Sequence, residues 1–143
     1  MENKKGEKEL VFMLYNYPNI DKLIENRKLE IIDKVNTSYN EWSKAKHSLY
    51  TNTLEDIVER IDSDKTISRL NKWKNIIEKF LGGISYNDMI KRFVTNKYFF
   101  NGSTEEVMKT LKINHDEYYF LDQITKKSLY RLCEKENLYA WKE

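Results

Sequence analysis

The sequence predicts an all-α fold, in which a long N-terminal helical arm or hairpin is followed by a C-terminal helix-turn-helix domain. Only one of the 143 residues is proline and four are glycine, too few for the frequent turns of a β-rich chain. Through most of the chain, apolar residues recur at three- and four-residue spacing, as they do on one face of an amphipathic helix. Hydrophobic residues make up 40% of the sequence, so we expect a packed core although 34% of positions are charged.

A short first helix is expected to stop near Pro18, because the residue before a proline disfavours the helical region. From Ile20 to Leu49 the apolar residues form a stripe along one unusually long helix, which we expect to act as an arm. The next helix of the same chain or the same helix of a second copy could bury this stripe. A homodimer through the arm is therefore one expectation.

Two further breaks are expected before the C-terminal region. Residues 51–53 read as a loop that starts a third helix, and residues 62–64, Asp-Ser-Asp, are expected to kink or break that helix. The pair Gly82-Gly83 is the strongest break, because glycine readily takes the left-handed conformation that closes a helix. The sequence thus predicts two domains, residues 1–83 for oligomerisation or partner binding and residues 84–143 as the helix-turn-helix domain.

The segment that follows the turn signal Asn101-Gly102 has chemically marked helix ends. Ser103 and Glu106 have the spacing of a capping box and predict a helix over residues 104–111. Asn114 and Glu117 repeat the pattern at the start of a second helix, after a three-residue turn. A short tight turn that leaves the second helix free to lie in a major groove is the geometry of a helix-turn-helix.

The residues expected to contact duplex DNA lie on or just before this second helix. They are Asn114, His115, Tyr119 and Gln123 near the base edges, and Lys126, Lys127 and Arg131 on phosphates. A solvated helix face explains the same residues equally well.

The order of these segments resembles phage transcriptional regulators of the ArpU/RinA type, which are similar to region 4 of sigma factors. The resemblance rests on an apolar helix followed by YFFNG, STEEVMKTLKIN and EYYFLDQITKKSLYRL, and on the opening MLYNYPNIDKLIENRKLEIID. These stretches cover about half of the chain. The resemblance implies a DNA-binding activator of late phage genes.

The sequence departs from that pattern around the turn. Met108 stands where such units usually carry a small residue, and His115, Asp116 and Glu117 stand where the relatives tend to place Ser, Arg or Thr. Carboxylates are repelled by phosphates, and their main use in base reading is contact with cytosine amino groups. Two alternatives therefore stay open: a helical protein-interaction factor that binds RNA polymerase or another protein, and a small terminase-like subunit with degenerate DNA reading.

The sequence carries no enzyme signature, since it lacks a glycine-rich phosphate loop, a nucleophile elbow and a His-Glu metal helix. We expect no catalytic residue, no metal and no cofactor; His47, His115 and Cys133 lie too far apart in sequence to suggest zinc. A lone cysteine forms no internal disulfide, and no run of about 18 apolar residues is present. A cytoplasmic protein without a membrane partner is therefore expected.

Most aromatic residues lie at helical spacing and are expected in the core. This group contains Trp73, Phe80, Phe93 and Tyr118, and Cys133 is placed on the inward side of the last helix. Tyr139 and Trp141 differ, because no further helix follows to cover them. We expect this terminal pair to dock on a partner or a second subunit.

Overall fold

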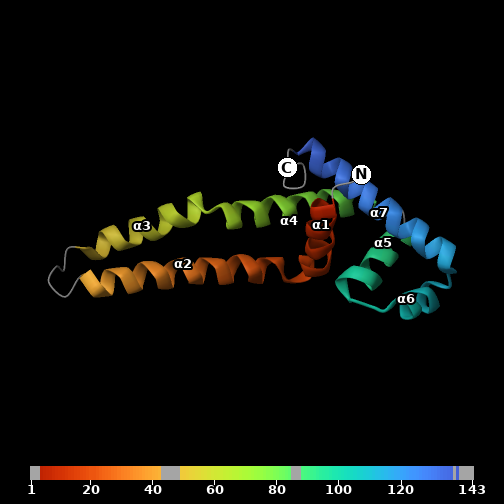
Figure 1. Ribbon diagram of the computed structural model, residues 1–143, viewed down its shortest axis with the longest axis horizontal. Helices are drawn as coiled ribbons and strands as arrows, with labels where there is room; N and C mark the ends of the chain where they lie inside the picture. Colours follow the sequence, from red (N-terminus) through yellow and green to blue (C-terminus); the bar gives the residue numbers. More distant parts are fainter. Residues whose placement is uncertain (1–3, 43–48, 85–87, 137, 139–143) are drawn as a thin grey trace. The chain divides into compact units, whose positions relative to one another are not determined.

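The computed structural model describes residues 4–42, 49–84, 88–136 and 138, and its regular elements are all helices (Figure 1). In chain order they are α1 (Lys4–Asn16), the 3-10 helix η1 (Tyr17–Asn19), α2 (Ile20–Trp42), α3 (Leu49–Ser63), α4 (Lys65–Gly83), α5 (Asp88–Val94), the π-helix η3 (Thr95–Phe99), α6 (Thr104–Leu111) and α7 (His115–Lys135). No strand occurs among the described residues, so the predicted all-α class is confirmed. Within the same residues, no helix combines the length and apolar character that a membrane span requires.

The described residues divide into two compact units. The hairpin unit holds those from Asn19 to Lys72, and the terminal unit holds those up to Pro18 together with those from Trp73 onward. The predicted division after Gly83 does not match these units. The reason is packing between distant parts of the sequence, which joins α1 to η3 and α7.

Trp73 shows how the start of the chain and the second half of α4 become parts of the terminal unit. Its side chain is fully buried, and the indole Nε1 donates a hydrogen bond of 3.0 Å to the Glu9 carboxylate of α1. Lys79 of α4 also forms an ion pair of 2.7 Å with Glu136 beyond the end of α7, which holds the pKa of that carboxyl below its usual range. Both contacts join segments that a boundary at residue 83 would separate.

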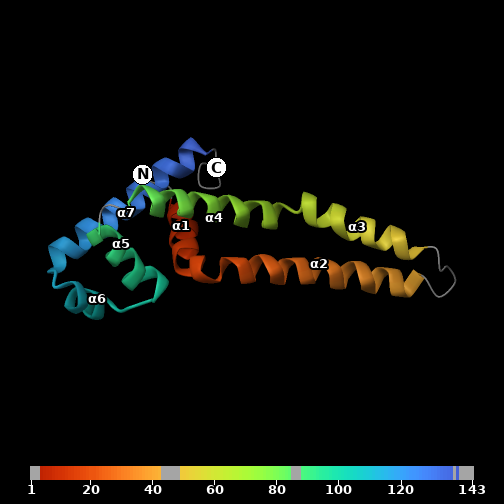
Figure 2. The same cartoon turned by 180° about the vertical axis from the view of Figure 1, so that it is seen from behind.

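In the hairpin unit, α2 and α3 run side by side, as both views show (Figures 1 and 2). Ile24, Ile31 and Val35 of α2 form a buried cluster with Ile67 of α4. Ile57, Ile61 and Leu70 pack against it as partly buried side chains. The apolar stripe predicted along α2 is therefore buried within one chain, by α3 and the start of α4.

Two predicted helix ends in this unit differ from the structure or reach beyond its described residues. The predicted loop at residues 51–53 is wrong, because α3 begins at Leu49; Tyr50, Leu54, Ile57 and Ile61 keep helical spacing, which favours extension of the helix towards its N-terminus. The arm predicted as far as Leu49 is a helix to Trp42, and residues 43–48 lie outside the described part of the chain.

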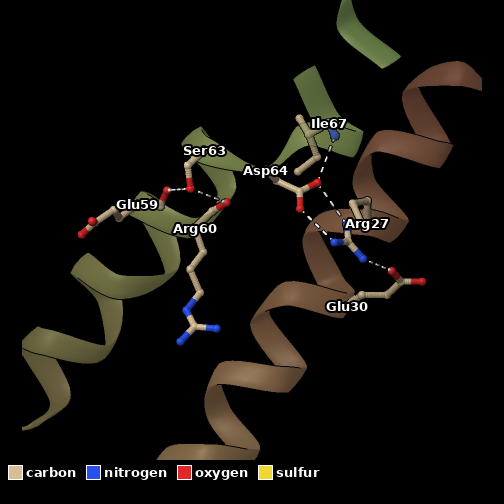
Figure 3. Close-up of polar contacts among 7 residues, drawn as sticks. All are labelled: Arg27, Glu30, Glu59, Arg60, Ser63, Asp64 and Ile67. Atoms are coloured by element: carbon tan, nitrogen blue, oxygen red, sulfur yellow. Dashed lines mark hydrogen bonds and ion pairs between the residues drawn. The ribbon is translucent and has the colours of Figure 1, made fainter. Parts of the chain in front are cut away.

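Asp64 forms the junction between α3 and α4 (Figure 3). Its Oδ2 accepts a hydrogen bond of 3.0 Å from the backbone N–H of Ile67, so it satisfies a free donor at the start of α4. The same carboxylate forms a bidentate pair with Arg27 of α2, at 3.1 Å from Nε and 2.8 Å from Nη2. The break predicted at residues 62–64 is confirmed.

In the terminal unit, the residues predicted for the core, Trp73, Phe80, Phe93, Tyr118 and Cys133, are all buried, which confirms that prediction. The predicted end of α4 at Gly82-Gly83 is also confirmed. Its expected mechanism is wrong, because neither glycine has a positive φ and the Ile84 N–H still donates to the Phe80 carbonyl at 3.1 Å. Tyr139 and Trp141, the predicted docking pair, lie outside the described residues.

α5 packs against α6, α7 and η3. The segment from η3 to the start of α6 therefore helps to place α6 against α5. In η3, the Phe100 N–H donates to the Thr95 carbonyl at 2.9 Å, and the chain then turns with Asn101 in the left-handed region at φ 54°. Gly102 follows where a Cβ atom would lie 2.8 Å from the carbonyl oxygen of Asn96. The predicted turn at Asn101-Gly102 therefore requires glycine for close approach of the backbone.

We expect Asp64→Ala to lower the free energy of unfolding by about 1–2 kcal/mol, because α4 loses its cap and Arg27 loses its bidentate partner. The matched control is Asp62→Ala, which removes an exposed carboxylate two residues away and should change stability by less than about 0.5 kcal/mol. Urea unfolding followed by circular dichroism at pH 7 measures both variants. Equal effects of the two substitutions would show that the junction carries no special stability.

The hydrogen bonds from Arg27, assisted by the Ile67 N–H, hold the pKa of Asp64 below its ordinary value of 3.8. The ionised form is favoured in the folded chain, so its stabilisation is complete above that ordinary value and is lost as the pH falls through the lower folded pKa. We expect the stability difference between the natural chain and Asp64→Asn to be constant above about pH 5 and to shrink below 3.8. A difference that stays unchanged on acidification, in urea unfolding at successive pH values, would contradict this assignment.

Candidate nucleic-acid interface

α6 and α7 each begin with a capping box, and both boxes were predicted. Ser103 Oγ accepts a hydrogen bond of 3.1 Å from the Glu106 N–H, and Glu106 accepts one of 2.9 Å from the Ser103 N–H. Asn114 Oδ1 accepts one of 2.8 Å from the Glu117 N–H, and Glu117 accepts one of 3.0 Å from the Asn114 N–H. The Ser103 N–H also lowers the pKa of Glu106. The two helix starts are thus fixed by reciprocal side-chain and backbone bonds.

The turn between these helices consists of Lys112, Ile113 and Asn114. Lys112 lies in the left-handed region with φ 58°, and the N–H groups of Lys112 and Ile113 both donate to the Met108 carbonyl. Sequence reasoning missed this conformation, because a lysine rather than a glycine adopts it. The bounds predicted for α6 and the start predicted for α7 are confirmed; that the corner acts as a DNA-binding helix-turn-helix stays a prediction.

Four of the predicted contact residues form one exposed stripe on α7. Tyr119, Gln123, Lys127 and Arg131 follow one another at four-residue intervals and are all exposed. Side chains at this spacing share one helix face, and the stripe extends about 18 Å at the rise of an α-helix. The structure therefore brings these four residues together.

Asn114 and His115 occupy the start of the helix, apart from this stripe. Asn114 is exposed, but its side-chain oxygen already accepts the Glu117 N–H in the capping box. His115 is the exposed first residue of α7. The role that the structure gives Asn114 is helix capping.

Lys126 points away from the exposed stripe, because its ammonium group lies between two carboxylates. Its Nζ is 3.3 Å from Asp122 of α7 and 3.3 Å from Glu7 of α1. Burial acts to lower the pKa of Lys126, but the two carboxylates outweigh it and the pKa is raised. The inner face of α7 thus uses this lysine for contact within the terminal unit.

The same inner face contains a buried polar cluster that sequence reasoning missed. Asp122 accepts a hydrogen bond from the Tyr98 hydroxyl, and burial together with this carboxylate raises the pKa of Tyr98. Lys97 Nζ lies 3.9 Å from Asp122 Oδ1, donates a 2.7 Å bond to the Tyr118 hydroxyl and sits 4.7 Å from that ring's centroid. The signal was present, since Tyr118, Asp122 and the buried Thr125 share helical spacing.

The outer face of α7 changes in chemistry along its length. Its first turn contains the exposed Asp116 and Glu117, and Tyr119 and Phe120 follow with 60% and 63% of their surface exposed. The cations of the stripe come later on the same helix. Within the described residues, no group of three or more His, Cys, Asp or Glu side chains is placed to hold a metal ion.

Comparison of the chain with family models, with curated proteins and with solved structures finds no significant match in any of the three. The resemblance to ArpU/RinA-type regulators therefore rests on the sequence motifs. The features that bear on the function of the exposed stripe are the geometry and chemistry of α6 and α7.

We expect Asn114→Ala to loosen the first turn of α7, at a cost of about 1 kcal/mol in local stability, because a capping acceptor is lost. Asn114→Asp should leave stability unchanged within a few tenths of a kcal/mol, since aspartate caps helices as well as asparagine does. Amide hydrogen exchange in the first turn of α7 measures the effect. If alanine and aspartate behave alike, the asparagine side chain has no capping role.

Proposed function

We propose that the protein is a transcription regulator that binds duplex DNA through α7. The observation that carries this proposal is the exposed stripe of Tyr119, Gln123, Lys127 and Arg131, on a helix that follows a three-residue turn. The stripe contains hydrogen-bonding and cationic side chains and no carboxylate. The likeness of the sequence motifs to ArpU/RinA-type regulators supports a phage or mobile-element origin.

The order of side chains along the stripe fits a helix in the major groove. That groove admits an α-helix, and helix-turn-helix units read bases with the N-terminal part of the second helix. Gln123 has the donor and acceptor pair that matches adenine N6 and N7, and Tyr119 offers a hydroxyl one turn earlier. Lys127 and Arg131 would contact phosphates and fix the register. His115, the first residue of α7, would lie near the bases at the N-terminal end of the helix.

Two of the residues expected from the sequence are left out of this contact surface. Asn114 is held in its capping box, and Lys126 is held by Asp122 and Glu7. With only two cations on the stripe, we expect modest affinity with a shallow salt dependence, a slope of about −2 in log K against log salt.

A second function, docking on a protein such as RNA polymerase, is favoured by one specific observation. Phe120 exposes 63% of its surface beside Tyr119, and a phenylalanine ring contributes no hydrogen bond to base reading. Exposed aromatic side chains are enriched at protein interfaces. In this case α7 would bind a groove on a partner protein. The protein would then be either a regulator that acts through RNA polymerase or another protein, or a small terminase-like subunit with degenerate DNA reading.

The first experiment selects bound duplexes from a random DNA pool at about 100 mM salt, where phosphate contacts still contribute. The test variant is Gln123→Ala/Lys127→Ala/Arg131→Ala. The matched control, Asn71→Ala/Lys65→Ala/Lys72→Ala, also removes one amide and two cations, from exposed positions of α4. We expect the natural chain and the control to enrich the same motif, and the test variant to bind it at least about tenfold more weakly.

Failure of the natural, folded chain to enrich any motif would end the proposal of direct DNA reading and favour a protein partner. Equal losses in both variants would show binding by net charge without a reading helix. Separate substitution of Gln123 then resolves its role, because loss of a base contact relaxes specificity at one position, whereas loss of a phosphate contact weakens all sequences alike.

A further inference from the structure

The exposed side of α3 combines apolar and acidic side chains in two adjacent rows. Leu54, Val58 and Asp62 form one row at four-residue spacing, and Glu55, Glu59 and Ser63 form the other; together they line a shallow groove. Leu54 and Val58 expose 52% and 58% of their surfaces. This groove lies wholly on one helix of the hairpin unit, so it is independent of α7 and of DNA binding.

The groove is separate from the hairpin core. Ile57 and Ile61 of the same helix pack against the core, whereas Figure 3 shows the Glu59 side chain directed away from α2. The two exposed aliphatic side chains, Leu54 and Val58, lie on successive turns and are bordered by polar groups. The apolar row is thus available to a ligand.

The charged side chains that line the groove are all carboxylates. No ion pair joins Glu55, Glu59 or Asp62 to a cation among the residues that the structure describes, whereas the neighbouring Asp56 pairs with Arg60 at 3.1 Å. A face of this kind repels phosphates and anionic lipid surfaces, and it attracts cations. Its complement is a surface with an apolar row and flanking positive charges.

We propose that this face of α3 binds an amphipathic helix of a partner protein, with Lys or Arg on both sides of its apolar row. Two parallel rows at four-residue spacing leave a groove that accepts the corresponding row of a second helix, which is the commonest mode of helix packing. The groove from Leu54 to Asp62 is about 12 Å long, enough for side chains from two successive turns of that helix. Charge complementarity selects the basic helix from other apolar helices.

The test uses the full chain and two synthetic helical peptides of about 18 residues that share one leucine row. One peptide carries Lys and Arg beside the leucines, and the other carries Glu at those positions. Binding is measured by fluorescence anisotropy, and the site is mapped by amide chemical shifts of the isotope-labelled protein. We expect saturable binding of the basic peptide, shifts confined to residues 54–63, and at least about tenfold weaker binding of the acidic peptide.

Two double variants separate this groove from general negative charge. Glu55→Gln/Glu59→Gln should weaken binding of the basic peptide about tenfold, and Leu54→Ser/Val58→Ser should abolish saturation. The matched control, Glu25→Gln/Asp33→Asn, removes two exposed carboxylates from α2 and should bind within about twofold of the natural chain. All four substituted positions of the test variants are exposed, so circular dichroism should show unchanged helicity.

Three results would overturn the proposal. The first is absence of shifts in α3 when the basic peptide is added, and the second is an equal loss of binding in the control. The third is a dimer in sedimentation whose formation protects residues 54–63, because the occupant would then be a second copy of this chain. Each of these readings is independent of DNA selection, which involves α7.

Discussion

The bidentate pair between Arg27 and Asp64 is the interaction on which the hairpin unit depends. Neither proline nor glycine stands between α3 and α4, and the local break comes from the Asp-Ser-Asp run at residues 62–64. Asp64 ends the first helix by capping the second, and Arg27 connects this corner to α2. One carboxylate thereby separates two helices and places both against the apolar stripe of a third.

A second carboxylate has the corresponding role in the terminal unit. Asp122 accepts a hydrogen bond from the Tyr98 hydroxyl and lies close to the ammonium groups of Lys97 and Lys126. Tyr98 and Lys97 connect α7 to η3, and the ion pair between Lys126 and Glu7 connects it to α1. Removing one member of such a buried cluster leaves a charge without a partner, which is strongly unfavourable. Together with the buried Leu121, Leu129 and Cys133, this cluster holds one face of α7 inward and leaves the other to solvent. The stripe from Tyr119 to Arg131 is exposed for that reason.

Helix ends that are marked by nearby capping residues were predictable from the sequence, whereas the partners of distant contacts were not. Ser103 and Asn114 each form a capping box with a glutamate three positions later, so both helix starts can be predicted from the sequence. The Asp-Ser-Asp break at residues 62–64 is equally local. Lys126 contacts Glu7, 119 positions away, and Trp73 contacts Glu9, 64 positions away. Periodicity shows that a side chain faces inward but does not identify its partner. The structure was therefore needed to show which segments make up the terminal unit and that Lys126 points away from the exposed stripe.

One of the two carboxylates at the start of α7 has a structural role. Of the carboxylates in the first turn, Glu117 is turned back to the Asn114 N–H, where it stabilises the helix, and only Asp116 is left without this role. The capping asparagine is occupied in the same way. After the exposed His115 and Asp116, the next exposed donors and acceptors of this face are Tyr119 and Gln123, more than one turn into the helix, and the cations follow. In the DNA complex that we propose, base contacts would start more than one turn into α7, later than is usual for a helix-turn-helix, and the 21 residues of α7 provide the length for such an approach.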